Sequence, residues 1–173
     1  IHCAVVLDLI GHDVPIPGYE DMLFVMGMES DADLAGVIER APAPDKLRVA
    51  AVPNRYVGDM SDHHVFRTHG RPYLFFSCGQ WEHYHMPSDT PEKLNYAKMR
   101  RMSEYLVDVV AAVSVEPLIG PFEGYDSTAV ELGLMKKHAG ALAAQLGLML
   151  ESQADLQRFV ETLVMRYGLL TDR

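Results

Sequence analysis

The sequence has 173 residues, a length typical of one domain or of one domain with a small appendage. Hydrophobic residues make up 49% and charged residues 23%, an ordinary globular composition that excludes a disordered chain. The net charge of −9 argues against nucleic-acid binding, because a phosphate backbone is bound by a basic surface. No apolar run approaches the about 20 residues that cross a bilayer, so we expect no membrane partner. The two cysteines, Cys3 and Cys78, are too few for a disulfide framework.

The chain begins at Ile1, inside an apolar stretch and without an initiator Met. We therefore expect it to have been processed or cut from something longer. The sequence leaves the compartment open, and secreted, periplasmic and cytoplasmic locations all remain compatible with it.

Strands and helices alternate through the first two-thirds of the chain. The apolar run at 3–11 is rich in branched residues and closed by Gly11, which predicts a strand buried on both faces. Further strands are predicted at 22–28, 48–52 and 73–77. Helices are predicted at 30–40, 62–69 and 90–113, begun by Ser30 with Asp33, by Ser61, and by Thr90 with Pro91. This alternation predicts an α/β fold with a mostly parallel sheet.

The pattern changes after Pro117. Residues 118–125 contain two glycines and a proline and are typical of a connector. Two amphipathic helices follow, one opened by Thr128 with Glu131 and one opened by Ser152 with Asp155 and stopped by Gly168. We predict an α/β domain over 1–116 and a helical appendage over 117–173 that packs on it.

Three segments place polar side chains near predicted strand ends, where reactive groups collect in open α/β sheets. They are Asp8, the segment 61–66 (SDHHVF) and the segment 82–90 (EHYHMPSDT). Each alone has an ordinary structural explanation: a strand-end acid that caps a helix or pairs with Arg, a capped helix start, and exposed loop histidines. Together, carboxylates, imidazoles and a phenol at one sheet edge favour an oxygen and nitrogen environment for zinc.

In their order and approximate spacing, these segments resemble the co-catalytic zinc aminopeptidases of metallopeptidase family 28, to which the glutaminyl cyclases are related. The resemblance rests on residues 8–11 (DLIG), 61–66, 70–72 (GRP) before an apolar strand, and Tyr84-His85 with Asp89-Thr90. It covers about residues 3–113. It implies a three-layer α/β/α sandwich around a mixed, mostly parallel sheet that binds two zinc ions.

The resemblance also assigns roles to individual residues. It implies that Asp8 binds one zinc ion and His85 the other, while Tyr84 polarises the scissile carbonyl. Asp62, with His63 as a further candidate, would support the metal site from behind the ligands. Trp81, just before the ligand histidine, would line an aromatic substrate pocket.

Part of the family pattern is absent from this sequence. The family also uses a His-x-Asp and an adjacent Glu-Glu pair, whereas this chain contains no Glu-Glu and its His12 and Asp13 are directly adjacent. Those elements should precede Ile1. One protein ligand per metal remains, where catalytic zinc usually has three, and the general base is missing.

The leading hypothesis is therefore a fragment of a zinc aminopeptidase that hydrolyses N-terminal peptide bonds and is inactive as this chain alone, with zinc bound weakly or not at all. The alternatives are a non-catalytic scaffold or interaction homologue, and a glutaminyl-cyclase-like acyltransferase. Sheet edges and apolar faces left uncovered would make the chain self-associate or pair with the missing N-terminal segment.

Overall fold

The structure is a computed structural model that describes residues 1–120 and 126–169. Its strands are β1 (Ala4–Leu7), β2 (Met22–Met26), β3 (Arg48–Ala51) and β4 (Tyr73–Ser77). Its α-helices are α1 (Ala32–Arg40), α2 (His63–Thr68), α3 (Tyr96–Val115), α4 (Thr128–Gln145) and α5 (Gln153–Tyr167). Three short 3-10 turns, η1 (Met28–Ser30), η2 (Asn54–Tyr56) and η3 (Pro91–Lys93), complete the described elements. The predicted α/β class is confirmed.

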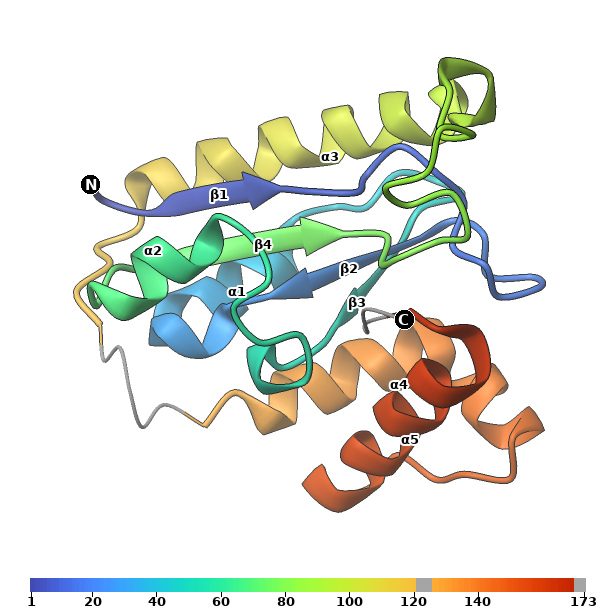
Figure 1. Ribbon diagram of the computed structural model, residues 1–173. Helices are drawn as coiled ribbons and strands as arrows, with labels where there is room; N and C mark the ends of the chain where they lie inside the picture. Colours follow the sequence, from blue (N-terminus) through green and yellow to red (C-terminus); the bar gives the residue numbers. More distant parts are fainter. Residues whose placement is uncertain (121–125, 170–173) are drawn as a thin grey trace.

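The four strands form one mixed sheet in the order β1-β4-β2-β3 (Figure 1). β1 runs parallel to β4, and β2 runs parallel to β3, while β2 and β4 are antiparallel. The central strands β2 (MLFVM) and β4 (YLFFS) are buried along their whole length, as their continuous apolar sequences predict.

The prediction that the first strand is buried on both faces is wrong. β1 lies at one edge of the sheet, its middle residues are only half-buried, and Leu7 is 46% exposed. An edge strand has a neighbour on one side only, and the burial of its side chains depends on what covers that edge. Whether a strand lies at the edge or in the centre of a sheet depends on the tertiary structure, so the apolar sequence of the strand alone does not predict it.

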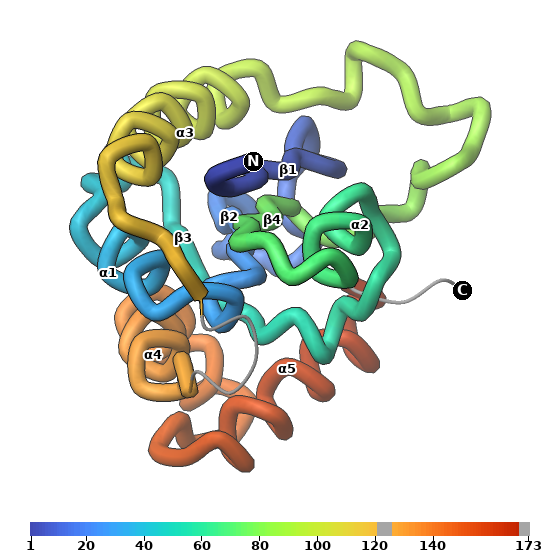
Figure 2. Tube along the Cα trace, turned by 90° about the vertical axis from the view of Figure 1, so that its left-hand side faces the viewer, coloured from blue at the N-terminus to red at the C-terminus, as the bar shows by residue number. Residues whose placement is uncertain are grey.

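Helices cover both faces of the sheet, but unequally (Figure 2). The long helix α3 and α1 lie on one face and contact each other, whereas the short α2 lies on the other face against β4 and β1. The structure therefore does not confirm the predicted three-layer α/β/α sandwich of the zinc exopeptidases.

The predicted starts of α1 and α3 differ from those observed, and the N-caps of α2 and α4 are Asp62 and Ser127 rather than Ser61 and Thr128. The cap of α1 is Asp31, whose carboxylate accepts a hydrogen bond from the Asp33 amide, while the Ser30 hydroxyl is buried in η1. α3 begins at Tyr96 with Asn95 as its cap, and the predicted start at Thr90–Pro91 forms only η3. In both cases several good capping residues stand close together, and the surrounding chain path selects among them.

The two C-terminal helices pack beside β3 at the opposite edge of the sheet (Figure 1). α4 lies along β3, and α5 packs on α4. Phe159 of α5 and Leu142 of α4 belong to the same apolar core as Phe24 of β2. The predicted start of α5 is confirmed, since Ser152 accepts from the Asp155 amide and Gly168 ends the helix. Residues 121–125 of the predicted connector lie outside the described residues. No helix in residues 1–120 or 126–169 is long and apolar enough to cross a membrane.

Candidate functional site

Asp8 directly follows β1, at the carboxyl end of the strand. Its Oδ2 accepts a hydrogen bond of 2.8 Å from the Ser61 hydroxyl, which stands just before α2. The next residue, Leu9, has a left-handed backbone with φ of 54°. Such a conformation is costly for a branched side chain, and residues held in it concentrate at binding and catalytic sites. The structure thus holds the carboxylate in place by one hydrogen bond and by an unusual turn.

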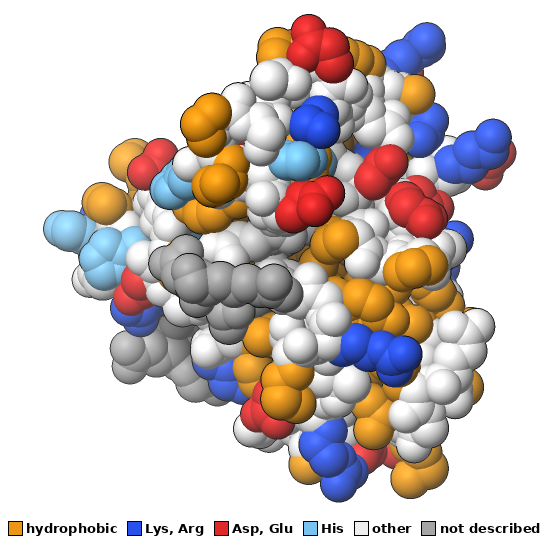
Figure 3. Space-filling model, turned by 45° about the vertical axis from the view of Figure 1, so that its right-hand side comes forward, with side chains coloured by type: hydrophobic (Ala, Val, Ile, Leu, Met, Phe, Trp, Pro, Cys, Tyr) orange, Lys and Arg blue, Asp and Glu red, His pale blue; other side chains and the backbone are white. Residues whose placement is uncertain are grey.

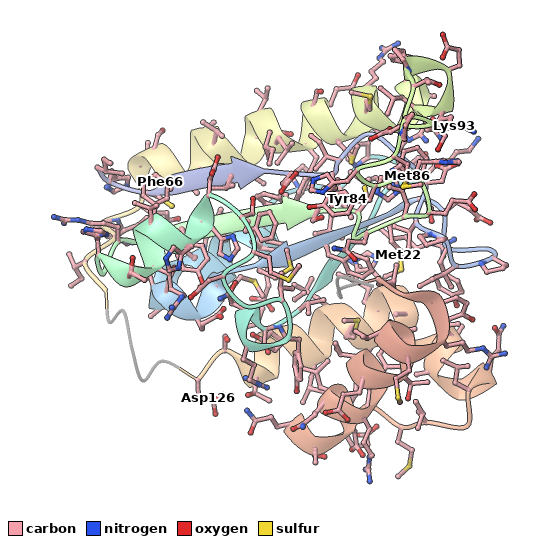
Figure 4. All side chains as sticks on the ribbon, in the orientation of Figure 1. Met22, Phe66, Tyr84, Met86, Lys93 and Asp126 are labelled. Carbon is pink, nitrogen blue, oxygen red and sulfur yellow. The ribbon has the colours of Figure 1, made fainter. Side chains whose placement is uncertain are left out.

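The segment 81–85 leaves β4 at the same end of the sheet, because β1 and β4 are parallel neighbours. It is a tight turn in which the Tyr84 amide bonds to the Trp81 carbonyl at 3.1 Å. His85 also has a left-handed backbone, with φ of 56°, and its ring stacks on that of Tyr84 with centroids 3.8 Å apart. Figure 4 shows Tyr84 and Met86 beyond the ends of β1 and β4, far from Phe66 on α2.

Two depressions share this end of the molecule. An open cleft of about 800 Å³ is lined by Trp81, Tyr84 and His85, together with Asp13 and Glu82. A small pocket of about 40 Å³ beside it is lined by Asp8 and Ser61 and again by Tyr84. Figure 3, which turns this end toward the viewer, shows histidine, acidic and apolar side chains intermingled on it. Tyr84 is therefore the predicted residue that connects the Asp8 pocket with the His85 cleft.

The other predicted supporting residues lie elsewhere. Asp62 is exposed at the start of α2, and neither Asp62 nor His63 is among the described residues that line the two depressions. His63, the first residue of α2, is fully buried, and its ring stacks on that of Phe75 of β4 with centroids 4.3 Å apart. Its Nε2 lies 2.9 Å from the Gly58 carbonyl oxygen, and burial lowers its pKa below the usual value. From this segment it is Ser61 that reaches the site.

His12 is a residue of the site that sequence analysis missed. Its buried ring stacks on Trp81, with centroids 4.6 Å apart and an interplanar angle of 5°. Nε2 lies 2.8 Å from the carbonyl oxygen of Gly79, and Nδ1 lies 2.8 Å from that of Asp13. Burial lowers the pKa of His12, and the two carbonyls oppose that shift. No local pattern marks this histidine, because its partners are brought to it by a loop 67 residues further along the chain.

The described residues contain no group of three or more His, Cys, Asp or Glu side chains that could hold a metal ion. Asp8 lines the small pocket and His85 the cleft, and both have the donor atoms that zinc prefers. Since a catalytic zinc ion generally has three protein ligands, these donors by themselves do not fit a complete zinc site.

Comparison with known proteins identifies the family of the chain. No curated protein and no solved structure matches the chain. The family model of peptidase family M28 matches residues 1–110, a stretch that contains β1 to β4 and every residue of the candidate site discussed above. The chain therefore belongs to peptidase family M28.

Proposed function

We propose that this chain supplies part of the active site of a zinc-dependent aminopeptidase. Membership of the family indicates a peptidase, that is, a hydrolase of peptide bonds. One observation supports the finer assignment: Asp8 and the segment 81–85 leave two parallel neighbouring strands at the same end, and Tyr84 lines both resulting depressions. This is the arrangement expected of an active site at the carboxyl end of an α/β sheet.

In this proposal Asp8 would bind one zinc ion and His85 would bind the other. When bound, the metal would supply the Lewis acidity for attack on the peptide carbonyl. The remaining ligands and the general base would come from residues outside this chain, since the described donors are too few to complete either metal site. The chain taken alone is then inactive and binds zinc weakly.

The chain's own residues would bind and polarise the peptide. The Tyr84 phenol would donate a hydrogen bond to the carbonyl oxygen as negative charge develops on it. Trp81 would form an apolar wall for the N-terminal residue of the substrate. His63 would act indirectly: by fixing α2 on β4 it keeps Ser61 beside Asp8. Asp62, exposed at the start of α2, would support the site only through that helix.

The free edge of the sheet offers a place for another strand to pair. β1 is paired on one side only within the described residues, and Leu7 and Ile1 beside that edge are exposed. An uncovered apolar edge favours addition of another strand. We propose that the chain pairs there with an N-terminal segment, or otherwise with a second copy. Light scattering coupled to size-exclusion chromatography of this chain alone tests the pairing with a second copy, and a stable monomer would contradict it.

The coding sequence before Ile1 provides the first test of the enzyme proposal. An in-frame His-x-Asp and Glu-Glu would support it, whereas a start codon next to Ile1 would contradict it. That second result would favour a non-catalytic scaffold, the alternative that agrees with the small number of metal donors in the described residues.

Mutations in the protein translated with that upstream sequence provide the second test. Asp8→Asn and His85→Gln should each reduce bound zinc and abolish hydrolysis of an aminoacyl-nitroanilide. Tyr84→Phe should retain zinc and lower kcat by about 100-fold, the effect of losing one oxyanion donor. His69→Gln, an exposed histidine at the end of α2, is the matched control and should change neither zinc content nor activity. Equal zinc content and activity in all four variants would overturn the proposal.

A further inference from the structure

The last described residues return from the helical appendage to the candidate site. α5 ends at Tyr167, and Gly168 follows with a left-handed φ of 67°, which reverses the chain. The next residue, Leu169, is only 1% exposed and lines the small pocket that also contains Asp8 and Tyr84. We call Tyr167–Leu169 the C-terminal tail.

A main-chain hydrogen bond connects the C-terminal tail to Gln80, just before the segment 81–85 of the site. The Gln80 amide donates a hydrogen bond of 2.8 Å to the Leu169 carbonyl. Gly79 has a left-handed φ of 78°, and a Cβ added there would lie 2.6 Å from the Leu169 carbonyl oxygen. Real side chains do not tolerate so close an approach to backbone, so the tail can lie here only because residue 79 is a glycine.

The same glycine connects the tail with the aromatic wall of the cleft. The Gly79 carbonyl oxygen lies 2.8 Å from Nε2 of His12, and the His12 ring stacks on Trp81. A continuous set of contacts thus runs from Leu169 through Gly79 and His12 to Trp81.

The tail also forms part of the cleft itself. Tyr167 and Gly168 line the cleft of about 800 Å³ together with Trp81, Tyr84 and His85. This wall lies outside residues 1–110, the stretch that matches the family. The shape of the cleft is therefore determined in part by a segment beyond the family-matching region.

We propose that the C-terminal tail is a positioning element of the site, which holds the segment 79–85 in its place and closes one side of the binding cleft. It follows that the appendage, rather than the matched region alone, determines which groups fit beside Trp81. That the group is the N-terminal residue of a peptide rests on the proposed function; the positioning of Trp81 by the tail does not.

Trp81 makes a direct test possible, because it is the single tryptophan of the chain. Gly79→Ala should displace the tail, shift the Trp81 emission to the red and raise the acrylamide quenching constant. Gly18→Ala is the matched control, since Gly18 has a φ of 80° and nothing within 4 Å of an added Cβ. Both substitutions place alanine at a similar positive φ, but only the added Cβ at residue 79 meets the tail. Equal emission and quenching in the two folded variants would overturn the proposal.

A second variant keeps the test valid if Gly79→Ala fails to fold. Tyr167→Ala should increase acrylamide access to Trp81 by removing a wall of the cleft, while circular dichroism stays unchanged. Tyr96→Ala, which removes a 61% exposed tyrosine from α3, should leave quenching unchanged. Unaltered quenching in Tyr167→Ala would contradict the proposal. Because these readouts require neither zinc nor activity, failure of the aminopeptidase assignment would leave them unaffected.

Discussion

The segment 61–64 and the loop 81–85 differ in how the fold uses their histidines. His63 is completely buried between α2 and β4, with its ring on Phe75, whereas His85 is exposed on a left-handed turn beside a cleft. Burial of a polar ring contributes packing and makes its charged form costly. Exposure on a strained backbone contributes little to stability but leaves donor atoms accessible. The comparison separates a histidine that maintains the fold from one that is available to a ligand.

The largest expected difference between the two segments is in stability. His63→Ala should lower the free energy of unfolding by about 3 kcal/mol, because it empties a space packed against two aromatic rings. The exposed neighbour in His64→Ala should cost about 0.5 kcal/mol or less. Urea denaturation measures both changes. Similar losses in the two variants would mean that the His63 ring is not a core residue.

Charging the His63 ring should have a smaller effect than removing it. Because burial lowers its pKa below 6.5, the folded chain binds fewer protons than the unfolded chain just below that pH. The stability that depends on neutral His63 is fully present above pH 6.5 and is lost as the pH falls through 6.5 toward the lowered pKa.

Urea denaturation at about pH 7.5 and about pH 5 tests this linkage. His63→Phe should lose less stability between these values than the unmodified chain does. Some dependence should remain, since burial also lowers the pKa values of His12 and His138. His64→Gln serves as the control and should retain the full dependence. An identical pH dependence in His63→Phe would refute the assignment.

In the loop 81–85, replacing the histidine should stabilise the fold, whereas replacing His63 should destabilise it. His85→Gly should raise the free energy of unfolding by about 1 kcal/mol, since glycine adopts a φ of 56° without the steric cost. Met86→Gly, at an exposed neighbour without a positive φ, should instead lower it by about 0.5 kcal/mol. Thermal denaturation distinguishes the two. A destabilised His85→Gly would show that the imidazole contributes more to the fold than the turn costs.

The smallest expected effect concerns the hydrogen bond that joins the segment 61–64 to Asp8, at the end of β1. Ser61→Ala should lower the free energy of unfolding by about 0.5–1 kcal/mol, because the Asp8 carboxylate loses a partner but remains in contact with water. Ser103→Ala, on an exposed face of α3, is the control and should be close to neutral. Chemical denaturation resolves this difference when the variants are measured side by side. A neutral Ser61→Ala would show that the bond from Ser61 is not needed to hold Asp8, whose amide also donates to the Phe76 carbonyl.

Local patterns in the sequence were sufficient to predict most elements. The apolar runs at β2 and β4 are long enough to require burial. Ser152 with Asp155 marks the start of α5, and Gly168 marks its end. The family was also recognisable from four segments in the expected order, and the match of the family model to residues 1–110 confirms it. Asp8, Tyr84 and His85 could be selected on that basis alone, and their placement at one end of the sheet follows from parallel β1 and β4.

Only the tertiary structure decided the rest, since it depends on contacts between distant parts of the chain. The order β1-β4-β2-β3 makes β1 an edge, which its own apolar sequence does not reveal. Whether His63 or Ser61 faces Asp8 depends on the rotation of α2 over the sheet. His12 and Leu169 reach the site through partners 67 and 89 residues away, Gly79 and Gln80. Sequence determines local conformation through propensity and periodicity, whereas the walls of a cleft are set by which remote backbones the packed core brings together.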